Sequence, residues 1–301
     1  MNVFLTGATG FVGRHVAARL LDDGHSVRCL VRDEEGADSD HLRGLGAELT
    51  VGNILDADSF AGAVGGCEAF VHLVGIIFER RDASFQQVHV MGTMNALAAA
   101  AVAGAKRFVF MSALGTGPEA ESAYHKSKWK AEEAVRTSGL HFTLFRPSTI
   151  YGPGSELFKM LQRQVRLMPV IPVIGNGRYR MQPISVFDVA ACFSGCLGND
   201  KAVDRTYDLG GPDSYTYNEI IDVLCEVMGK KRLKFHAPVA LVKPVAWLSE
   251  RLMSKPLLTL DQLAMLMKDN ICDIDAMRGE LGVEPVEFRK GIIEMMSGSL
   301  R

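Results

Sequence analysis

The sequence has little net charge and lacks a hydrophobic run long enough to cross a membrane, and both absences restrict its function. Its 301 residues include 33 Lys and Arg and 35 Asp and Glu, for a formal net charge of -2. Such a balance offers no overall field that attracts nucleic acid or acidic lipid, so we expect no nucleic-acid partner. The uncharged, Ala-rich residues 94–105 fall well short of the roughly 20 apolar residues of a membrane span. They predict a tightly packed helix.

Cysteine is scarce and scattered. The six cysteines lack the paired spacing of zinc sites and the density of secreted, disulfide-rich domains. Cys192 and Cys196 fall one helical turn apart, but core packing explains that spacing better than metal binding. We therefore predict reduced core cysteines and no metal. The N-terminus shows no basic leader or cleavage site before its first apolar segment, from which we expect a cytoplasmic protein.

What the sequence does have is a large apolar fraction in a repeating pattern. Hydrophobic residues make up 48% of the chain and charged residues 23%, which is enough to bury a sizeable core. In the first half, short apolar strands alternate with helical stretches, as is typical of a parallel sheet covered by helices. We predict a doubly wound α/β fold with strands at residues 2–6, 26–31, 48–51, 69–73, 107–111 and 141–145, and helices at residues 11–23, 57–64, 84–103 and 122–138.

The pattern changes after about residue 151, where glycine and proline turn signals interrupt the alternation. Helical periodicity then returns, with one strand predicted at residues 205–209. We predict two units: residues 1–150, and a smaller C-terminal α/β lobe of residues 151–301 that is partly interleaved with the sheet. The helices of this lobe are expected at residues 187–197, 217–228, 239–253 and 259–267.

A glycine-rich turn joins the first predicted strand to the first predicted helix. Gly7 allows the sharp turn, Gly10 lets backbone N–H groups approach a pyrophosphate, and Gly13 lets the helix pack close to the strand. The N-terminus of the helix adds partial positive charge, which favours phosphate. An ordinary glycine-rich turn is the less favoured alternative. The pattern predicts a Rossmann-type dinucleotide site formed by Gly7, Thr9, Gly10, Phe11, Val12 and Gly13.

The choice of cofactor depends on the end of the second strand. A carboxylate there would bond to the adenosine ribose, whereas an arginine would pair with a 2′-phosphate. The strand ends in Arg32, and Arg14 lies in the first helical turn, where the helix dipole disfavours a cation without an anion nearby. Both arginines favour NADP(H) over NAD(H). The alternative is that Arg32 is solvated and pairs with Asp33.

Three further residues form a candidate catalytic group. Tyr124 and Lys128 are four residues apart on a predicted helix, so their side chains lie on one face, one turn apart. A nearby ammonium and an oxidised nicotinamide ring favour the phenolate of Tyr124, which makes it an acid–base group. Ser112 follows the fifth strand, at the sheet edge where such folds bind ligands.

The G-x-x-G-x-x-G spacing and this trio resemble the extended or atypical branch of the short-chain dehydrogenase/reductase superfamily. The resemblance implies that Lys128 also holds the nicotinamide ribose. At His89 most extended members carry an Asn that supports the lysine. Three alternatives follow: histidine does the same work, it marks weakened chemistry, or it only packs on the helix surface. The resemblance further implies cofactor contacts at Asn53, Ile54, Leu73, Val74, Gly75 and Pro147.

Residues 72–79, 110–115 and 145–154 together resemble one subgroup, which contains bacterial proteins similar to the nucleotide-binding accessory subunit of respiratory complex I. This likeness extends to about residue 215. It leaves two hypotheses: an NAD(P)-dependent oxidoreductase or epimerase of unknown substrate, or a non-catalytic subunit in which NADPH supports the fold. In an enzyme, Glu79, Arg80, Arg81, Thr149 and Tyr151 would face the substrate.

The C-terminal lobe also suggests a surface for partners. Residues 240–248, which include Lys243, and residues 257–267 are largely apolar, and we expect from them a possible contact with a respiratory complex or a peripheral position at the inner membrane. An ordinary amphipathic helix packed on the lobe is the favoured alternative.

Overall fold

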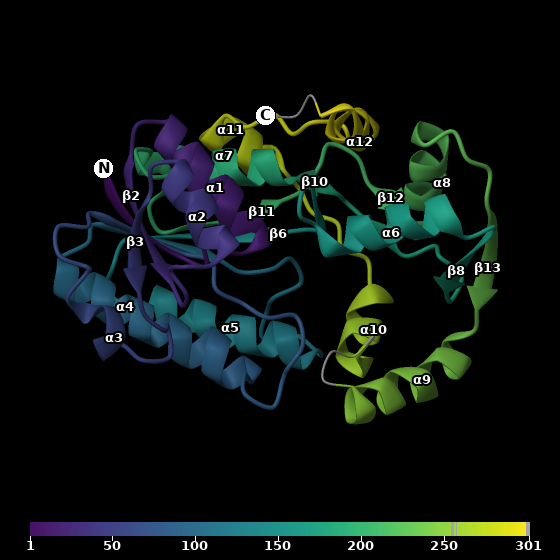
Figure 1. The fold of residues 1–301 in the computed structure, drawn as a ribbon, viewed down its shortest axis with the longest axis horizontal. Coiled ribbons are helices and arrows are strands. Elements are labelled where there is room, and N and C mark those ends of the chain that lie inside the picture. The colour runs from purple at the N-terminus through teal and green to yellow at the C-terminus, as the bar shows by residue number, and fades with distance from the viewer. Residues whose placement is uncertain (254–255, 257, 299–301) are drawn as a thin grey trace.

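The computed structural model describes residues 1–253, 256 and 258–298, and one large sheet dominates it. Seven parallel strands lie in the order β11 (Arg205–Leu209), β6 (Phe142–Pro147), β5 (Arg107–Met111), β4 (Ala69–His72), β1 (Asn2–Thr6), β2 (Ser26–Val31) and β3 (Glu48–Val51) (Figure 1). This order confirms the predicted doubly wound, Rossmann-type fold. The order reverses between β1 and β4, which is where folds of this kind bind their ligands.

Two helical layers cover the sheet. One face carries α1 (Phe11–Asp22), α2 (Ala37–Gly44) and α7 (Val186–Gly195), and the other carries α3 (Asp58–Ala61), α4 (Gly92–Ala103) and α5 (Ala123–Arg136) (Figure 1). Successive residues of β1 enter different layers because strand side chains alternate between faces. Val3 and Leu5 belong to the core under α1 and α7, whereas Phe4 belongs to the core under α4 and α5.

Some elements differ from their predicted extent. Residues 84–103 begin as a π-helix, η1 (Gln86–Met91), before continuing as α4, and the helix predicted at residues 57–64 is the four-residue α3. The sequence did not predict α2, which is short and buries only two of its residues. Nor did it predict α6 (Glu156–Leu167), because the glycine and proline turn signals just before it pointed to irregular structure.

The chain after residue 150 forms a smaller lobe and also completes the large sheet, of which β11 is an edge strand. The lobe has a core of its own, in which Tyr151, Phe158 and Phe288 are buried. The boundary at residue 150 stays a prediction. In the part of the chain that the structure describes, no helix combines the length and apolar character of a membrane span. The lobe contains β7 (Ile150–Tyr151), α6, β8 (Val170–Ile174), β9 (Arg180–Met181), β10 (Ile184–Ser185), β12 (Tyr215–Thr216), α8 (Tyr217–Val227), β13 (Leu233–Ala237), α9 (Val239–Leu252), α10 (Leu260–Leu266) and α12 (Phe288–Ser297). Helix α11 (Asp275–Leu281) packs instead beside β11 and α7, on the large sheet.

The cysteines occupy the cores, as predicted. All six are free thiols, and all are buried except Cys272, which is half-buried. Burial raises the pKa of Cys192 and raises that of Cys196 to about 12, so both thiols are protonated at neutral pH. Cys192 on α7 and Cys196, which directly follows this helix, both pack in the core under α1 and α7.

Candidate functional site

The glycine turn between β1 and α1 has a geometry that other residues would disrupt. Gly7 has a φ of +82°, and its carbonyl accepts a hydrogen bond from the N–H of Gly10, with 3.0 Å between N and O. A Cβ atom on Gly13 would lie 2.0 Å from the carbonyl oxygen of Gly7, so helix and turn touch directly. Helix α1 begins without a side-chain cap or an acidic residue in its first turn. This cradle therefore fits a pyrophosphate.

The other residues of the predicted phosphate site surround the turn. Gly10 is exposed and Thr9 and Phe11 are half-buried, whereas Val12 is buried in the core under α1. A Cβ atom on Gly7 would lie 3.0 Å from the backbone nitrogen of Val74, which follows β4. The glycine turn thus lies against the loop after β4, although the two are far apart in the sequence.

Arg32 is exposed at the end of β2 and makes no ion pair with any described residue. Asp33 instead accepts hydrogen bonds from the backbone N–H of Glu35 and, at its carbonyl, from the hydroxyl of Ser39. The alternative in which Asp33 neutralises Arg32 is therefore absent from this structure. The guanidinium of Arg14 lies 3.7 Å from the carboxylate of Asp38, at the distant limit of an ion pair.

Asn53 and Ile54 follow β3 in a tight turn. The side-chain oxygen of Asn53 accepts a hydrogen bond from the N–H of Leu55, and Ile54 is buried beneath this turn. The amide of Asn95 on α4 donates to the carbonyl of Ile54. These bonds hold the turn in place, and Asn53 itself is exposed. Pro147 is buried at the end of β6, where its carbonyl accepts from the N–H of Leu114.

The loop after β4 meets the candidate catalytic helix. Leu73 is buried and its N–H donates to the carbonyl of Thr6, which extends the pairing of β1 and β4 by one residue. A Cβ atom on Gly75 would lie 3.1 Å from Nζ of Lys128 and 3.4 Å from Nε2 of His89. Gly75 therefore allows the backbone to approach both side chains closely.

Lys128 is a buried ammonium at the carboxyl end of β5. The residue is only 2% exposed, its Nζ donates to the carbonyl of Met111 at 3.0 Å, and it lies 5.1 Å from the ring centroid of Phe110. Desolvation lowers the pKa of Lys128 to about 8, against the opposing effect of Glu132. The neighbouring Ser112 is buried, with its hydroxyl 3.4 Å from that of Thr116.

Tyr124 lies one helical turn before Lys128 on α5 and is half-buried. Its ring is edge-on to those of Phe85 and His89, with centroids 5.8 and 5.4 Å apart. Burial raises the pKa of Tyr124 to about 12, in the opposite direction to the effect expected from the ammonium. Desolvation of the phenol is the cause of this rise. Tyr124 is therefore protonated at neutral pH and can donate a proton.

His89 connects the loop after β4 to α5. Its Nε2 accepts a hydrogen bond from the N–H of Ile76 at 3.0 Å, so Nδ1 carries the proton and donates to the hydroxyl of Ser127 at 2.7 Å. That hydroxyl in turn donates to the carbonyl of Tyr124 at 2.6 Å. Burial and the charge of Lys128 lower the pKa of His89 to about 2, so the ring stays neutral. His89 is a connecting residue of the site rather than a surface histidine.

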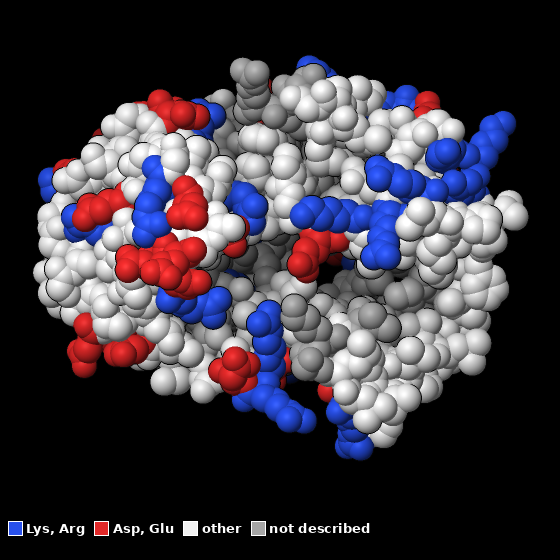
Figure 2. Space-filling model, in the orientation of Figure 1, with Lys and Arg blue, Asp and Glu red and all other residues white. Residues whose placement is uncertain are grey.

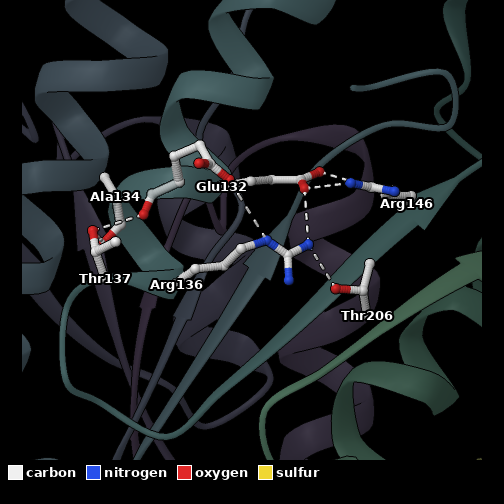
Figure 3. A network of polar contacts seen from close by, with 7 residues as sticks. Glu132, Ala134, Arg136, Thr137, Arg146 and Thr206 are labelled. Carbon is white, nitrogen blue, oxygen red and sulfur yellow. Dashed lines mark hydrogen bonds and ion pairs between the residues drawn. The ribbon is translucent and has the colours of Figure 1, made fainter. Parts of the chain in front are cut away.

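A buried carboxylate fixes the other end of α5 (Figure 3). Glu132 is fully buried and accepts two hydrogen bonds from Arg146 of β6, at 2.8 and 2.6 Å. Arg136 donates to the same carboxylate at 3.2 Å and to the hydroxyl of Thr206 on β11 at 2.8 Å. This network joins α5 to two strands, one turn beyond Lys128. The sequence displays only the spacing of Glu132 and Arg136, four residues apart on α5, because Arg146 and Thr206 come from separate strands.

The N-terminus of α5 is bound by a residue from the distant lobe. The two carboxylate oxygens of Asp261 accept hydrogen bonds from the N–H groups of Ala123 and Tyr124, at 2.7 and 3.1 Å. The hydroxyl of Ser122 accepts a third bond from the N–H of His125. An anion at a helix N-terminus is stabilising. No local pattern marks Asp261, because its partners lie 137 and 138 residues away.

A cavity of about 870 Å³ adjoins this end of α5. Glu79, Arg80 and Arg81 line it, whereas Thr149 does not, and the substrate-facing role of these residues stays a prediction. The expectation for Tyr151 is wrong: its ring is fully buried in the core of the lobe, because β7 turns it toward α6 and α12. The other lining residues are Phe78, Asp82, Phe85, Ala123, Glu250, Arg251, Leu252, Met253, Pro256, Thr259 and Asp261.

Known proteins resemble this chain along most of its length. The model of a family described as NAD(P)H-binding matches residues 7–197. The chain is 29% identical to subunit 9 of the mitochondrial NADH dehydrogenase (ubiquinone) 1 alpha subcomplex of Arabidopsis thaliana, over 95% of this chain and 77% of that protein. It is 35% identical to the ceramide reductase of Caulobacter vibrioides, over 76% of this chain and 71% of that protein.

The fold also matches solved structures. The UDP-glucuronic acid 4-epimerase of Bacillus cereus, in complex with UDP-glucuronic acid and NAD, superposes with a TM-score of 0.76 at 18% identity, over 99% of this chain and 98% of that one. The glycine cradle, the sheet order and these likenesses agree. The chain belongs to the NAD(P)H-binding family.

Proposed function

We propose that this protein is an NAD(P)H-dependent oxidoreductase or epimerase acting at a carbon that carries a hydroxyl or carbonyl group. One observation carries the proposal: the buried ammonium of Lys128 lies against Gly75, at the point where the strand order reverses, one turn from Tyr124. A buried cation with a lowered pKa is costly unless it has a task. The bound cofactor would supply or accept the hydride.

The side chains have separate roles in this proposal. Tyr124 donates its proton to the substrate oxygen in the direction of reduction, for which its protonated state is the required one. Ser112 orients the same oxygen, and Lys128 binds the ribose hydroxyls of the cofactor. The substrate reaches Tyr124 from the cavity lined by Arg80 and Arg81.

We further propose a preference for NADP(H). Arg32 is exposed at the end of β2, where a 2′-phosphate would need a cation, and the nearby Arg14 has only a long ion pair. Asn53 and Ile54 would border the adenine ring, while Leu73, Val74 and Pro147 would line the cofactor further along. Arg32→Ala should weaken NADPH binding at least ~10-fold more than NADH binding, because a charge-assisted contact to the 2′-phosphate is lost. An equal loss for both would refute the assignment.

Turnover itself is tested with wild type and Tyr124→Phe. The panel of substrates should contain sugar nucleotides, hydroxyketones, quinones and, because of the Caulobacter vibrioides relative, ceramides. Wild type should oxidise NADPH with at least one of them, and Tyr124→Phe should lose about a hundredfold or more in kcat while still binding NADPH. A variant as active as wild type would refute the role of Tyr124.

The second candidate function is non-catalytic. In it the protein is a cytoplasmic, NADPH-binding accessory subunit that a respiratory complex holds at the inner membrane. The likeness to subunit 9 along 95% of the chain supports it. It predicts tight NADPH binding without turnover of any substrate in the panel, and unfolding at a markedly higher temperature when NADPH is bound.

A further inference from the structure

Helix α9 exposes a stripe of large apolar side chains. Leu241, Val245, Leu248 and Leu252 are between 49% and 75% exposed and follow the spacing i, i+4, i+7, i+11, which places them along one face. The buried residues of the helix, Ala246 and Ser249, lie elsewhere around it. Helix α9 therefore turns its smaller residues to the protein and its large apolar residues outward.

The strand before α9 continues this surface. Leu233 and Phe235, two residues apart on β13, are 72% and 60% exposed, so both face outward. They pair in register with Val170 and Pro172 of β8, which are exposed as well. Only Pro238 separates the end of β13 from the beginning of α9. We call the exposed apolar residues of β8, β13 and α9 the apolar rim.

Basic side chains predominate in the segment that carries most of the apolar rim, although the whole chain is slightly acidic. Residues 229–253 contain six Lys and Arg, of which Lys234 pairs with Asp222 of α8. They contain one acidic residue, Glu250, which accepts a hydrogen bond from the N–H of Leu260. Arg251 lies over the ring of Trp247, 4.4 Å from its centroid. Figure 2 shows further Lys and Arg gathered over α6, where acidic side chains are sparse; Lys159, Arg163 and Arg166 belong to this helix.

We propose that the apolar rim docks on an anionic lipid bilayer, with α9 lying in the plane of the interface. Apolar side chains flanked by lysine and arginine, with a tryptophan at the margin, have the chemistry of interfacial helices. The 14 residues of α9 span about 21 Å, less than the roughly 30 Å hydrocarbon core, so the helix lies on the membrane. The basic excess selects anionic headgroups.

Docking would also orient the candidate active site. Arg251, Leu252 and Met253, at the end of α9, line the cavity at the N-terminus of α5, and Leu252 also belongs to the apolar rim. A docked molecule therefore holds the cavity opening close to the lipid headgroups. This surface is defined by β8, β13 and α9 alone, and the proposal stands whether or not the cavity turns over a substrate.

Flotation with vesicles tests the docking. The full chain should float with equimolar phosphatidylcholine and phosphatidylglycerol, bind pure phosphatidylcholine at least ~10-fold less, and lose anionic binding in high salt. Leu241→Ser/Leu248→Ser should reduce flotation at least ~10-fold. The matched control, Ile293→Ser/Met296→Ser, changes two exposed apolar residues of α12, which Figure 1 places across the lobe from α9. It should float like wild type.

Tryptophan fluorescence identifies the segment that enters the lipid. The chain has two tryptophans, Trp129 and Trp247, so the Trp129→Phe variant reports on α9 alone. Its emission should shift to the blue on anionic vesicles and be quenched by brominated lipid. Unshifted emission, or flotation equal in the α9 and control variants, would overturn the proposal. So would a concentration-dependent dimer that α9 substitutions abolish while no vesicle binds, since the rim would then join two copies of the chain.

Discussion

Replacing His89 by alanine would remove the connection between the loop after β4 and α5. Two hydrogen bonds are lost, from Ile76 to Nε2 and from Nδ1 to Ser127, each contributing about 1 kcal/mol. The N–H of Ile76 is then left without a partner, at a cost of about 1–3 kcal/mol. We expect the free energy of unfolding to fall by about 3–5 kcal/mol, a large part of the roughly 5–15 kcal/mol typical of a folded protein.

Urea denaturation and NADPH titration measure the two effects of His89→Ala separately. Because Gly75 lies against both His89 and Lys128, displacement of this loop should weaken NADPH binding roughly tenfold even where the variant is folded. Ser127→Ala is the matched control: it keeps the bond to Ile76 and should lose only about 1–2 kcal/mol, with NADPH affinity unchanged. If His89→Ala is as stable as Ser127→Ala and binds NADPH like wild type, His89 only packs and the reasoning is refuted.

Three further outcomes follow from the same structure. Glu132→Gln should lose about 3 kcal/mol in urea denaturation, because Arg146 and Arg136 keep their charges without a carboxylate; a loss below about 1 kcal/mol would contradict the network of Figure 3. Gly13→Ala should abolish NADPH binding in calorimetry, since its Cβ would lie 2.0 Å from the Gly7 carbonyl oxygen, and intact binding would contradict the cradle. Burial lowers the pKa of Lys128 from its ordinary value of 10.5 to about 8 in the folded chain, so the unfolded chain binds more protons between these two values. Relative to Lys128→Met, wild type should therefore become more stable as the pH rises from about 8 to about 10.5, and a flat difference would argue against a buried ammonium.

Local patterns in the sequence determined the general form of this protein. Alternating apolar strands and helices specify a parallel sheet, because each strand needs a helical cover on both faces. The glycines at positions 7 and 13 have steric requirements that act within a single turn. Tyr124 and Lys128 share a helix face simply because they are four residues apart. All of these are short-range relations, which a sequence displays directly.

Only the tertiary structure decided how the site is held and what surrounds it. The partners of His89 come from a loop and from α5, and Asp261 reaches α5 from the other lobe, so no spacing in the sequence could reveal either contact. Burial raised the pKa of Tyr124, and the extent of desolvation depends on all the neighbours of the side chain together. It also placed Tyr151 in a core rather than a cavity. The apolar and basic residues near α9 were visible in the sequence, but whether they were packed or exposed depended on which face of the helix the lobe covers.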